Sequence, residues 1–506
     1  MHFSVIPVIN TIFSIFSDHP ADLTCPKTAI SSKIQTGSFP EGGLAQFPAS
    51  YDCGIEFEIP SGYVLKYRIQ TNVEEPGDKV VVRDSLSAHH EFTSASSIFY
   101  APAEHAKVWI KTESSSSSFH FTWEYIDVTN YEEVKKPLGE VMSLNLTSNH
   151  YYRFEKETSD RFSSYGQIQL HTGSLSGGVD SSLSKIFVYD GFNLKSKFVG
   201  TLDQIASSTK AFKSTGYSLT LVNFYRLPSD SYVIASQYNS ISDLQSYDLV
   251  ILSKEKVFRR TMKSASKSTA TTFYCIDSDE TYITDLKFVG QSSNRAISFA
   301  MLAPSQGNYL LTYRDPRVTG RLHGSYDERF DPQMLPQQIL TNTFTMTLYE
   351  SEVEVELKSG PLEKYSQIVP GRKGKVVSPS KWNPAASSAV TFYTNFTASE
   401  YVRFVINPGY MHLENPQDKL LVEIGTGKPW ETPQFFDFKN GYHYQREVVG
   451  KYMAITFIGT SNTSDFILNY RVEASATTKY PYETASMSSS VTFGSSVLAL
   501  ILAILF

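Results

Sequence analysis

The sequence predicts an all-β protein made of tandem antiparallel β-sandwich units. Its 31 Tyr and 33 Phe, with abundant Val, Ile, Ser and Thr, favour strands over helices. Apolar and polar residues alternate along short segments that end in turn residues, which is the pattern of half-buried strands. Segments near the two ends of the chain resemble one another, which indicates an internal repeat. A chain of 506 residues is long enough for several such units.

Residues 1–17 are interpreted as a signal peptide. They are mostly apolar, and Ile15 and Ser17 suit the positions before a cleavage site, although the segment has no Lys or Arg. An apolar first strand is the alternative. Entry to the secretory pathway would make the Asn-x-Ser/Thr sequons available for glycosylation on surface loops. The predicted glycan acceptors are Asn145, Asn395 and Asn462.

The chain contains three Cys. Cys25 and Cys53 lie close together near the predicted mature N-terminus, and in an oxidising compartment we expect them to form a disulfide. In the loop-entropy model this bond contributes about 3–4 kcal/mol to stability. Cys275 is interpreted as a buried free thiol, and an intermolecular bridge is the alternative.

The first sandwich unit is predicted at residues 22–129. Val108–Ile110 and Phe119–Tyr125 form the two strands of a hairpin, with a polar loop between them. The four aromatic residues of the second strand share one face, because they occupy every second position. Trp109 and Trp123 lie on these adjacent strands, and we expect both in the core.

The other units are predicted at residues 130–248, 249–361 and 362–473. The last of these repeats the hairpin of the first unit, and its Gln417–Val422 resembles Gly77–Val82. The two middle units are weaker copies. Six basic residues form a cluster in the third unit, and they are Lys254, Lys256, Arg259, Arg260, Lys263 and Lys267. This cluster is interpreted as a solvated face, with contact to anionic glycans or lipids, or a dibasic cleavage site, as alternatives.

The last ten residues, Val497–Phe506, are entirely apolar and too short to span a bilayer as a helix. Small residues and a short neutral spacer precede them, which is the pattern of a glycosylphosphatidylinositol (GPI) attachment signal. We expect the lipid to be attached at Ser488 or Ser486, with residues 491–506 removed. Residues 474–490 are rich in Ser and Thr and predict a stalk.

No residue pattern supports an enzyme, a cofactor site or a nucleic-acid site. The chain has no H-E-x-x-H motif, and Leu175 stands where a nucleophile would be in Gly173–Gly177. The net charge of −6 gives no electrostatic reason to bind nucleic acid. Trp382 and Trp430 lie beside Pro-containing loops, where an exposed indole could anchor a sugar or a protein.

The first unit resembles a CUB domain, and more narrowly the CUB-like domain of secreted and GPI-anchored nematode proteins. The resemblance rests on Cys25, on Tyr51–Gly62 with its Cys53, on Asp78–Val82 and on the aromatic closing hairpin. It is good over residues 22–128, fair over 365–474 and weak between them. It implies a jelly-roll-like antiparallel sandwich, an extracellular location and a binding role. Family members are associated with epithelial surfaces and innate defence.

CUB domains often bind Ca²⁺ through carboxylates near one end of the sandwich. Asp78 matches the central carboxylate of that site, and Glu113 could supply a second ligand. The sequence departs from the family pattern at Gln70, which stands where the family has an acidic residue, and it lacks the second disulfide. Solvated loop carboxylates are the alternative to a Ca²⁺ site.

The sequence therefore predicts a GPI-anchored protein on the extracellular face of the plasma membrane. Its expected role is binding glycan or protein ligands, and the nematode resemblance implies the setting of innate defence at an epithelium. The alternative is a structural surface-coat or adhesion protein with no specific soluble ligand.

Overall fold

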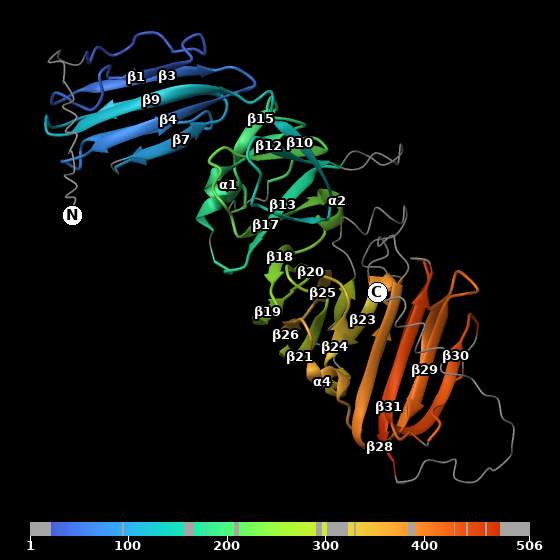
Figure 1. The fold of residues 1–506 in the computed structure, drawn as a ribbon. Coiled ribbons are helices and arrows are strands. Elements are labelled where there is room, and N and C mark those ends of the chain that lie inside the picture. Colours follow the sequence, from blue (N-terminus) through green and yellow to red (C-terminus); the bar gives the residue numbers. More distant parts are fainter. Residues whose placement is uncertain are drawn as a thin grey trace, which may run out of the picture. The chain divides into compact units, whose positions relative to one another are not determined.

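The computed structural model describes residues 22–475 except 94–95, 156–165, 179, 207–211, 290–295, 301–321, 328–329, 383–389, 430, 442–443 and 461–462. Strands make up most of this part of the chain, and nearly all pair antiparallel, which confirms the all-β prediction (Figure 1). The strands form two compact units, one mainly from residues up to Asp243 and the other mainly from Leu252 onward. The predicted signal peptide, GPI site and tail lie outside the described residues, as do Asn462 and Trp430.

Two sheets form the first sandwich. The four-stranded sheet has the order β3-β8-β5-β6, with β3 at Asp52–Ile59, β8 at Glu104–Lys111, β5 at Lys79–Arg83 and β6 at His89–Phe92. The five-stranded sheet has the order β1-β9-β4-β7, with β2 also on β9; the strands are β1 (Thr36–Phe39), β2 (Ala45–Gln46), β4 (Tyr63–Asn72), β7 (Ser97–Ala101) and β9 (Ser118–Asp127).

The aromatic core of this sandwich confirms the alternation predicted for β9. Phe119, Phe121, Trp123 and Tyr125 are all buried and face the other sheet, and Phe57 of β3 packs edge-on against Phe121 and Trp123. Tilted and edge-to-face ring contacts of this kind add to the stability gained from burying apolar area.

A second sandwich follows in the first compact unit. Its larger sheet has the order β10-β12-β16-β14-β15, with strands at Glu132–Pro137, His150–Glu155, Ser218–Asn223, Ile186–Asp190 and Lys197–Thr201. Its smaller sheet has the order β11-β17-β13, at Val141–Ser143, Ser231–Gln237 and Ile168–Ser174. The short helices are η1 (Ser181–Lys185), α1 (Leu202–Ala206) and α2 (Tyr238–Ile241).

The third group of strands also forms two sheets. One has the order β18-β20-β25-β22-β23, at Ser246–Leu252, Thr269–Cys275, Thr343–Tyr349, Ala296–Ala300 and Leu322–Asp327. The other has the order β19-β26-β21-β24, at Val257–Lys263, Glu352–Ser359, Thr281–Val289 and Gln337–Ile339, and η2 (Pro332–Met334) precedes β24. Cys275 is a buried free thiol at the end of β20.

Six strands form one sheet in the last group. The order is β27-β32-β28-β31-β29-β30, at Lys373–Val377, Asp465–Ala474, Val390–His412, Arg446–Gly459, Lys419–Gly425 and Gln434–Phe438. The short helices α4 (Glu363–Ser366) and α5 (Pro379–Trp382) precede β28. Both halves of β28 contribute to one core, with Phe396 before its bulge and Phe404 after it.

The last group of strands has the same order and pairing of strands as the first sandwich. The order β3-β8-β5-β6 corresponds to the first half of β28, then β31, β29 and β30. The order β1-β9-β4 corresponds to β27, β32 and the second half of β28. The chain turns at Pro60–Gly62 between β3 and β4, whereas residues 398–401 continue as strand, so two sheets of the first copy are joined in the last.

The structure places three of the six residues of the basic cluster on an edge strand. Arg259 and Lys263 lie on β19 and form ion pairs with Glu356 and Glu352 of the neighbouring β26, at 2.6 and 3.1 Å. The interpretation as a solvated face fits these two residues. Among the helices in the part of the chain that is described, none is long and apolar enough to cross a membrane.

Candidate functional site

Asp78 organises one end of the first sandwich. It lies in the loop before β5, and its side chain is almost completely buried. One carboxylate oxygen accepts the backbone N–H groups of Glu113 and Ser114 at 2.6 and 3.1 Å, and the other accepts the Ser114 hydroxyl at 2.6 Å. The carboxylate thereby fixes the loop between β8 and β9.

The pKa of Asp78 reflects these contacts. Burial, the largest single influence, raises the pKa, but hydrogen bonds from Ser114, Ser117 and the backbone of Glu113 together outweigh it and bring the pKa to about 2. The side chain is therefore ionised at neutral pH. Its charge is balanced by donors from the loop rather than by a basic residue.

Asp418 repeats this arrangement in the last group of strands. It precedes β29 as Asp78 precedes β5, and it accepts the backbone N–H and the hydroxyl of Thr460, both at 2.6 Å, and the hydroxyl of Ser464. Burial raises the pKa of Asp418, and the hydrogen bonds again outweigh it and hold the pKa at about 2. The internal repeat therefore includes a buried carboxylate and the donors around it.

These contacts bear on the predicted Ca²⁺ ligands. Both oxygens of Asp78 already accept hydrogen bonds, and Glu113 takes part through its backbone N–H. The described residues contain no group of three or more His, Cys, Asp or Glu that could hold a metal ion. A cation at Asp78 would have to displace these donors. Ca²⁺ at Asp78 and Glu113 stays a prediction without a test.

Trp109 lies on the outer face of the four-stranded sheet, so its predicted place in the core is wrong. Its neighbours on β8, Val108 and Ile110, are buried, and strand alternation turns the indole to the outside, where it is 42% exposed. The alternation of Ala106, Val108 and Ile110 already contains this signal. Trp123, the other Trp of the hairpin, is buried as predicted.

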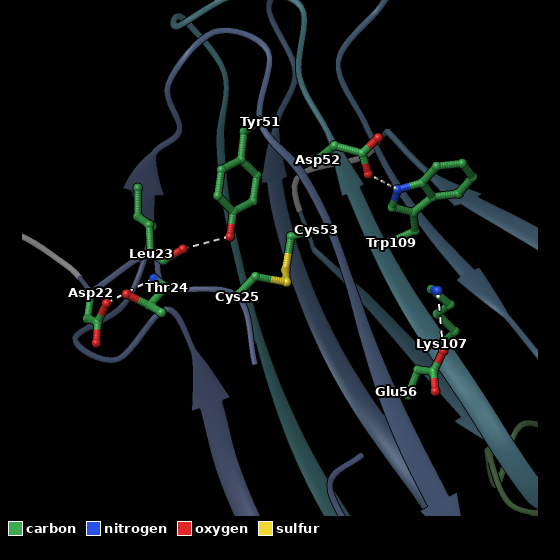
Figure 2. Close-up of a disulfide and its surroundings, with 10 residues drawn as sticks. All are labelled: Asp22, Leu23, Thr24, Cys25, Tyr51, Asp52, Cys53, Glu56, Lys107 and Trp109. Atoms are coloured by element: carbon green, nitrogen blue, oxygen red, sulfur yellow. Dashed lines mark hydrogen bonds and ion pairs between the residues drawn. A yellow bond between two sulfur atoms is a disulfide. The ribbon is translucent and has the colours of Figure 1, made fainter. Parts of the chain in front are cut away.

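A hydrogen bond holds the Trp109 ring in place. The indole N–H donates to Asp52 of β3 at 2.6 Å (Figure 2). Asp52 pairs with Lys111 in the sheet, so the bond runs diagonally across the two strands. An exposed aromatic ring that is already fixed loses little side-chain entropy when a ligand stacks on it.

Polar groups flank the ring. Lys107, two residues before Trp109 and on the same face, forms an ion pair with Glu56 at 3.3 Å (Figure 2). Gly54, which pairs with Trp109, leaves space for the Lys107 side chain, because a Cβ at this position would lie 2.3 Å from Lys107 Cε. The result is a flat surface with one aromatic ring and charged groups that can form hydrogen bonds.

The disulfide lies beside this surface. Cys25 and Cys53 are bonded, as expected, and Cys53 is the residue after Asp52 on β3 (Figure 2). The bond ties the N-terminal segment to the sheet, and the Tyr51 hydroxyl adds a 2.8 Å hydrogen bond to the carbonyl of Leu23. The disulfide therefore anchors β3 at the residue next to Asp52, which orients Trp109.

The remaining predicted site residues do not gather at this surface. Trp382 is buried on α5, so it offers no exposed indole as an anchor; the polar and Pro-rich sequence around it does not reveal its packing. Asn145 is exposed in the second sandwich, and Asn395 lies on β28. Glycosylation at either residue stays a prediction.

Residues 20–129 match the family model described as a CUB-like domain. The chain contains a CUB-like domain. This match covers the sandwich that carries Asp78, Trp109 and the disulfide. The narrower nematode family stays a prediction.

Several solved structures are similar to the chain at low identity. They are the CUB1-EGF-CUB2 domains of rat MASP-1 (10% identity, 66% of this chain and 99% of that chain, TM-score 0.18), the CUB1-EGF-CUB2 domain of human MASP-1/3 (9%, 64% and 100%, 0.16) and the full extracellular region of zebrafish Gpr126/Adgrg6 (11%, 68% and 54%, 0.19). The search of curated proteins finds no match.

Proposed function

We propose that the protein is an extracellular ligand-binding protein whose CUB-like domain presents Trp109 to a glycan. The observation that carries this proposal is the exposed indole, fixed by its hydrogen bond to Asp52 on a mostly polar sheet face. Sugars stack their apolar C–H faces on such rings while their hydroxyls bond to neighbouring polar groups, here Lys107 and Glu56. The role is binding rather than catalysis.

The proposal includes a GPI anchor on the outer face of the plasma membrane. The Cys25–Cys53 disulfide supports an oxidising compartment, since such bonds persist mainly in secreted and cell-surface proteins. The apolar C-terminal sequence supports the lipid anchor. Phosphatidylinositol-specific phospholipase C should release the chain from expressing cells. Retention on cells whose known GPI-anchored proteins are released would contradict the anchor.

The setting we propose is innate defence at an epithelial surface. It is supported only by the resemblance of the CUB-like domain to nematode proteins of that kind. A surface-coat or adhesion protein is the competing role, and it would need no specific soluble ligand.

A glycan array tests the binding role directly. The full chain, expressed in animal cells and purified, is applied to an array of animal and microbial glycans. The proposal predicts a defined set of bound glycans. A uniformly blank array, together with no binding to microbial surfaces by protein that keeps its disulfide, would favour the surface-coat role.

A further inference from the structure

We propose a second binding site in the CUB-like domain, a groove on the outer face of the five-stranded sheet that binds a sulfate group of an acidic glycan. This site goes beyond the surface around Trp109, because it lies on the other sheet and uses different chemistry. The groove has a volume of about 480 Å³. Its polar lining comes from three adjacent strands, β1, β9 and β4.

The strand register arranges the groove in two rows. Arg68 of β4 lies opposite Thr122 of β9, which lies opposite Ser38 of β1. The next row contains Lys66, Glu124 and Thr36 in the same order. Side chains two residues apart on a strand point to the same face, so both rows line the outside of the sandwich. The first row therefore offers a guanidinium group and two hydroxyls.

The two rows differ in whether their charged side chains are already paired within the protein. Lys66 forms an ion pair with Glu124 at 3.2 Å, which compensates both charges. Arg68 is exposed, and within the part of the chain that the structure describes its guanidinium forms no ion pair or hydrogen bond. Burial lowers the pKa of His120, the outward residue next to Thr122 on β9, so this side chain is neutral at pH 7. Arg68 is thus the uncompensated charge of the groove, and it is positive.

This donor set fits a tetrahedral oxyanion. A guanidinium group can donate two parallel hydrogen bonds to an oxyanion, and hydroxyls of Thr and Ser can donate to the remaining oxygen. Phosphate has the same shape, so a phospholipid headgroup shares this chemistry. We assign the groove to a sulfated glycan because it lies on the outer face of a sheet and is lined by hydroxyl groups that also suit sugar hydroxyls.

The test measures heparin binding by the full chain, expressed in animal cells and captured on a sensor through an epitope tag. We expect Arg68→Gln to weaken binding about tenfold or more, the value of a charged hydrogen bond. Thr122→Val, which removes only the hydroxyl, should weaken it less. Glu124→Gln should strengthen binding, because it removes the carboxylate that compensates Lys66. A merely structural role of these residues predicts no gain.

The control is Arg83→Gln, which removes the same charge from an exposed position on β5 of the other sheet. Equal losses in Arg68→Gln and Arg83→Gln would overturn the site, as would unchanged binding in Arg68→Gln. Desulfated heparin should bind poorly, and stronger binding to vesicles containing phosphatidylinositol phosphates than to heparin would overturn the glycan assignment. Trp109→Ala should leave heparin binding intact, so failure of either site can be seen separately.

Discussion

Two buried aspartates show how single residues shape this molecule. Asp78 and Asp418 are nearly inaccessible to water, yet neither has a basic partner among its described hydrogen bonds. Hydroxyl and backbone donors stabilise each charge, and they come from the loop after the neighbouring paired strand, which is β8 for Asp78 and β31 for Asp418. Each carboxylate therefore couples the conformation of one loop to the start of one strand.

The first prediction concerns Asp78→Asn. The folded-state pKa of about 2 lies below the ordinary value of 3.8, so the ionised side chain stabilises the fold above about pH 4, and this contribution is lost as the pH falls toward 2. We expect the substitution to lower stability at pH 7 by about 1–3 kcal/mol and to flatten the pH dependence between pH 4 and 2. Thermal melts across this pH range measure both effects.

Asp418→Asn should behave in the same way, because its carboxylate has the same environment. The exposed Asp437 on β30 provides a control, and Asp437→Asn should change stability little. A pH profile of Asp78→Asn that matches the unsubstituted protein would show that the carboxylate does not fix the loop.

At the scale of single residues, the sequence predicts burial that follows from local alternation, but not roles that depend on contacts distant in sequence. The burial of Phe119, Phe121 and Trp123 follows from alternation alone, which is a local property. The role of Asp78 depends on donors more than 30 residues away, so no local pattern reveals it. For Trp109, the general preference of Trp for the core points inward, whereas its position in the alternation of β8 points outward, and the position prevails.

At the scale of elements, the strands fix the positions of the site residues such as Trp109. The four-stranded sheet supports the Trp109 surface, and the disulfide anchors the β3 strand of that sheet to the N-terminal segment. Strand positions were well predicted where alternation is regular, as in β9 and β32. The joining of two strands into the long β28 was not predicted, since a turn and a bulge differ only in backbone geometry.

The second prediction concerns the disulfide. Replacing Cys25 and Cys53 together by Ser should destabilise the CUB-like domain by about 3–4 kcal/mol, because the unfolded chain regains the entropy of an open loop. Denaturant unfolding of the full chain measures the loss. Cys275→Ser is the matched control for loss of a thiol, and the Cys25/Cys53 pair should cost more stability than this single change.

The third prediction concerns the Arg259-Arg260 pair on β19. Proteases need an extended, accessible segment, whereas this strand pairs with β26 along its whole length. Limited trypsin digestion of the folded chain should therefore cleave elsewhere before it cleaves here. An early fragment that begins at Arg260 or Thr261 would contradict the paired strand and revive the dibasic cleavage site.

At the scale of the whole molecule, the chain combines two copies of one strand plan with two further groups of strands between them. The copies share a buried aspartate but differ on their outer faces, since Trp109 has no Trp counterpart on the outer face of the six-stranded sheet among the described residues. A shared scaffold with different surfaces is what a multi-site binding protein requires. Sequence comparison within the chain revealed the repeat but not which surface carries the exposed indole.

Binding of a glycan found on the array to the Trp109→Ala chain tests the proposed function most directly. Phe435→Ala, which removes an exposed aromatic ring from the other compact unit, is the matched control. Loss of one stacking ring should cost about 1–3 kcal/mol, or roughly 5- to 150-fold in affinity, whereas the control should bind like the unsubstituted chain. Equal affinity of all three proteins for the glycan would contradict the assignment of Trp109 as the binding surface.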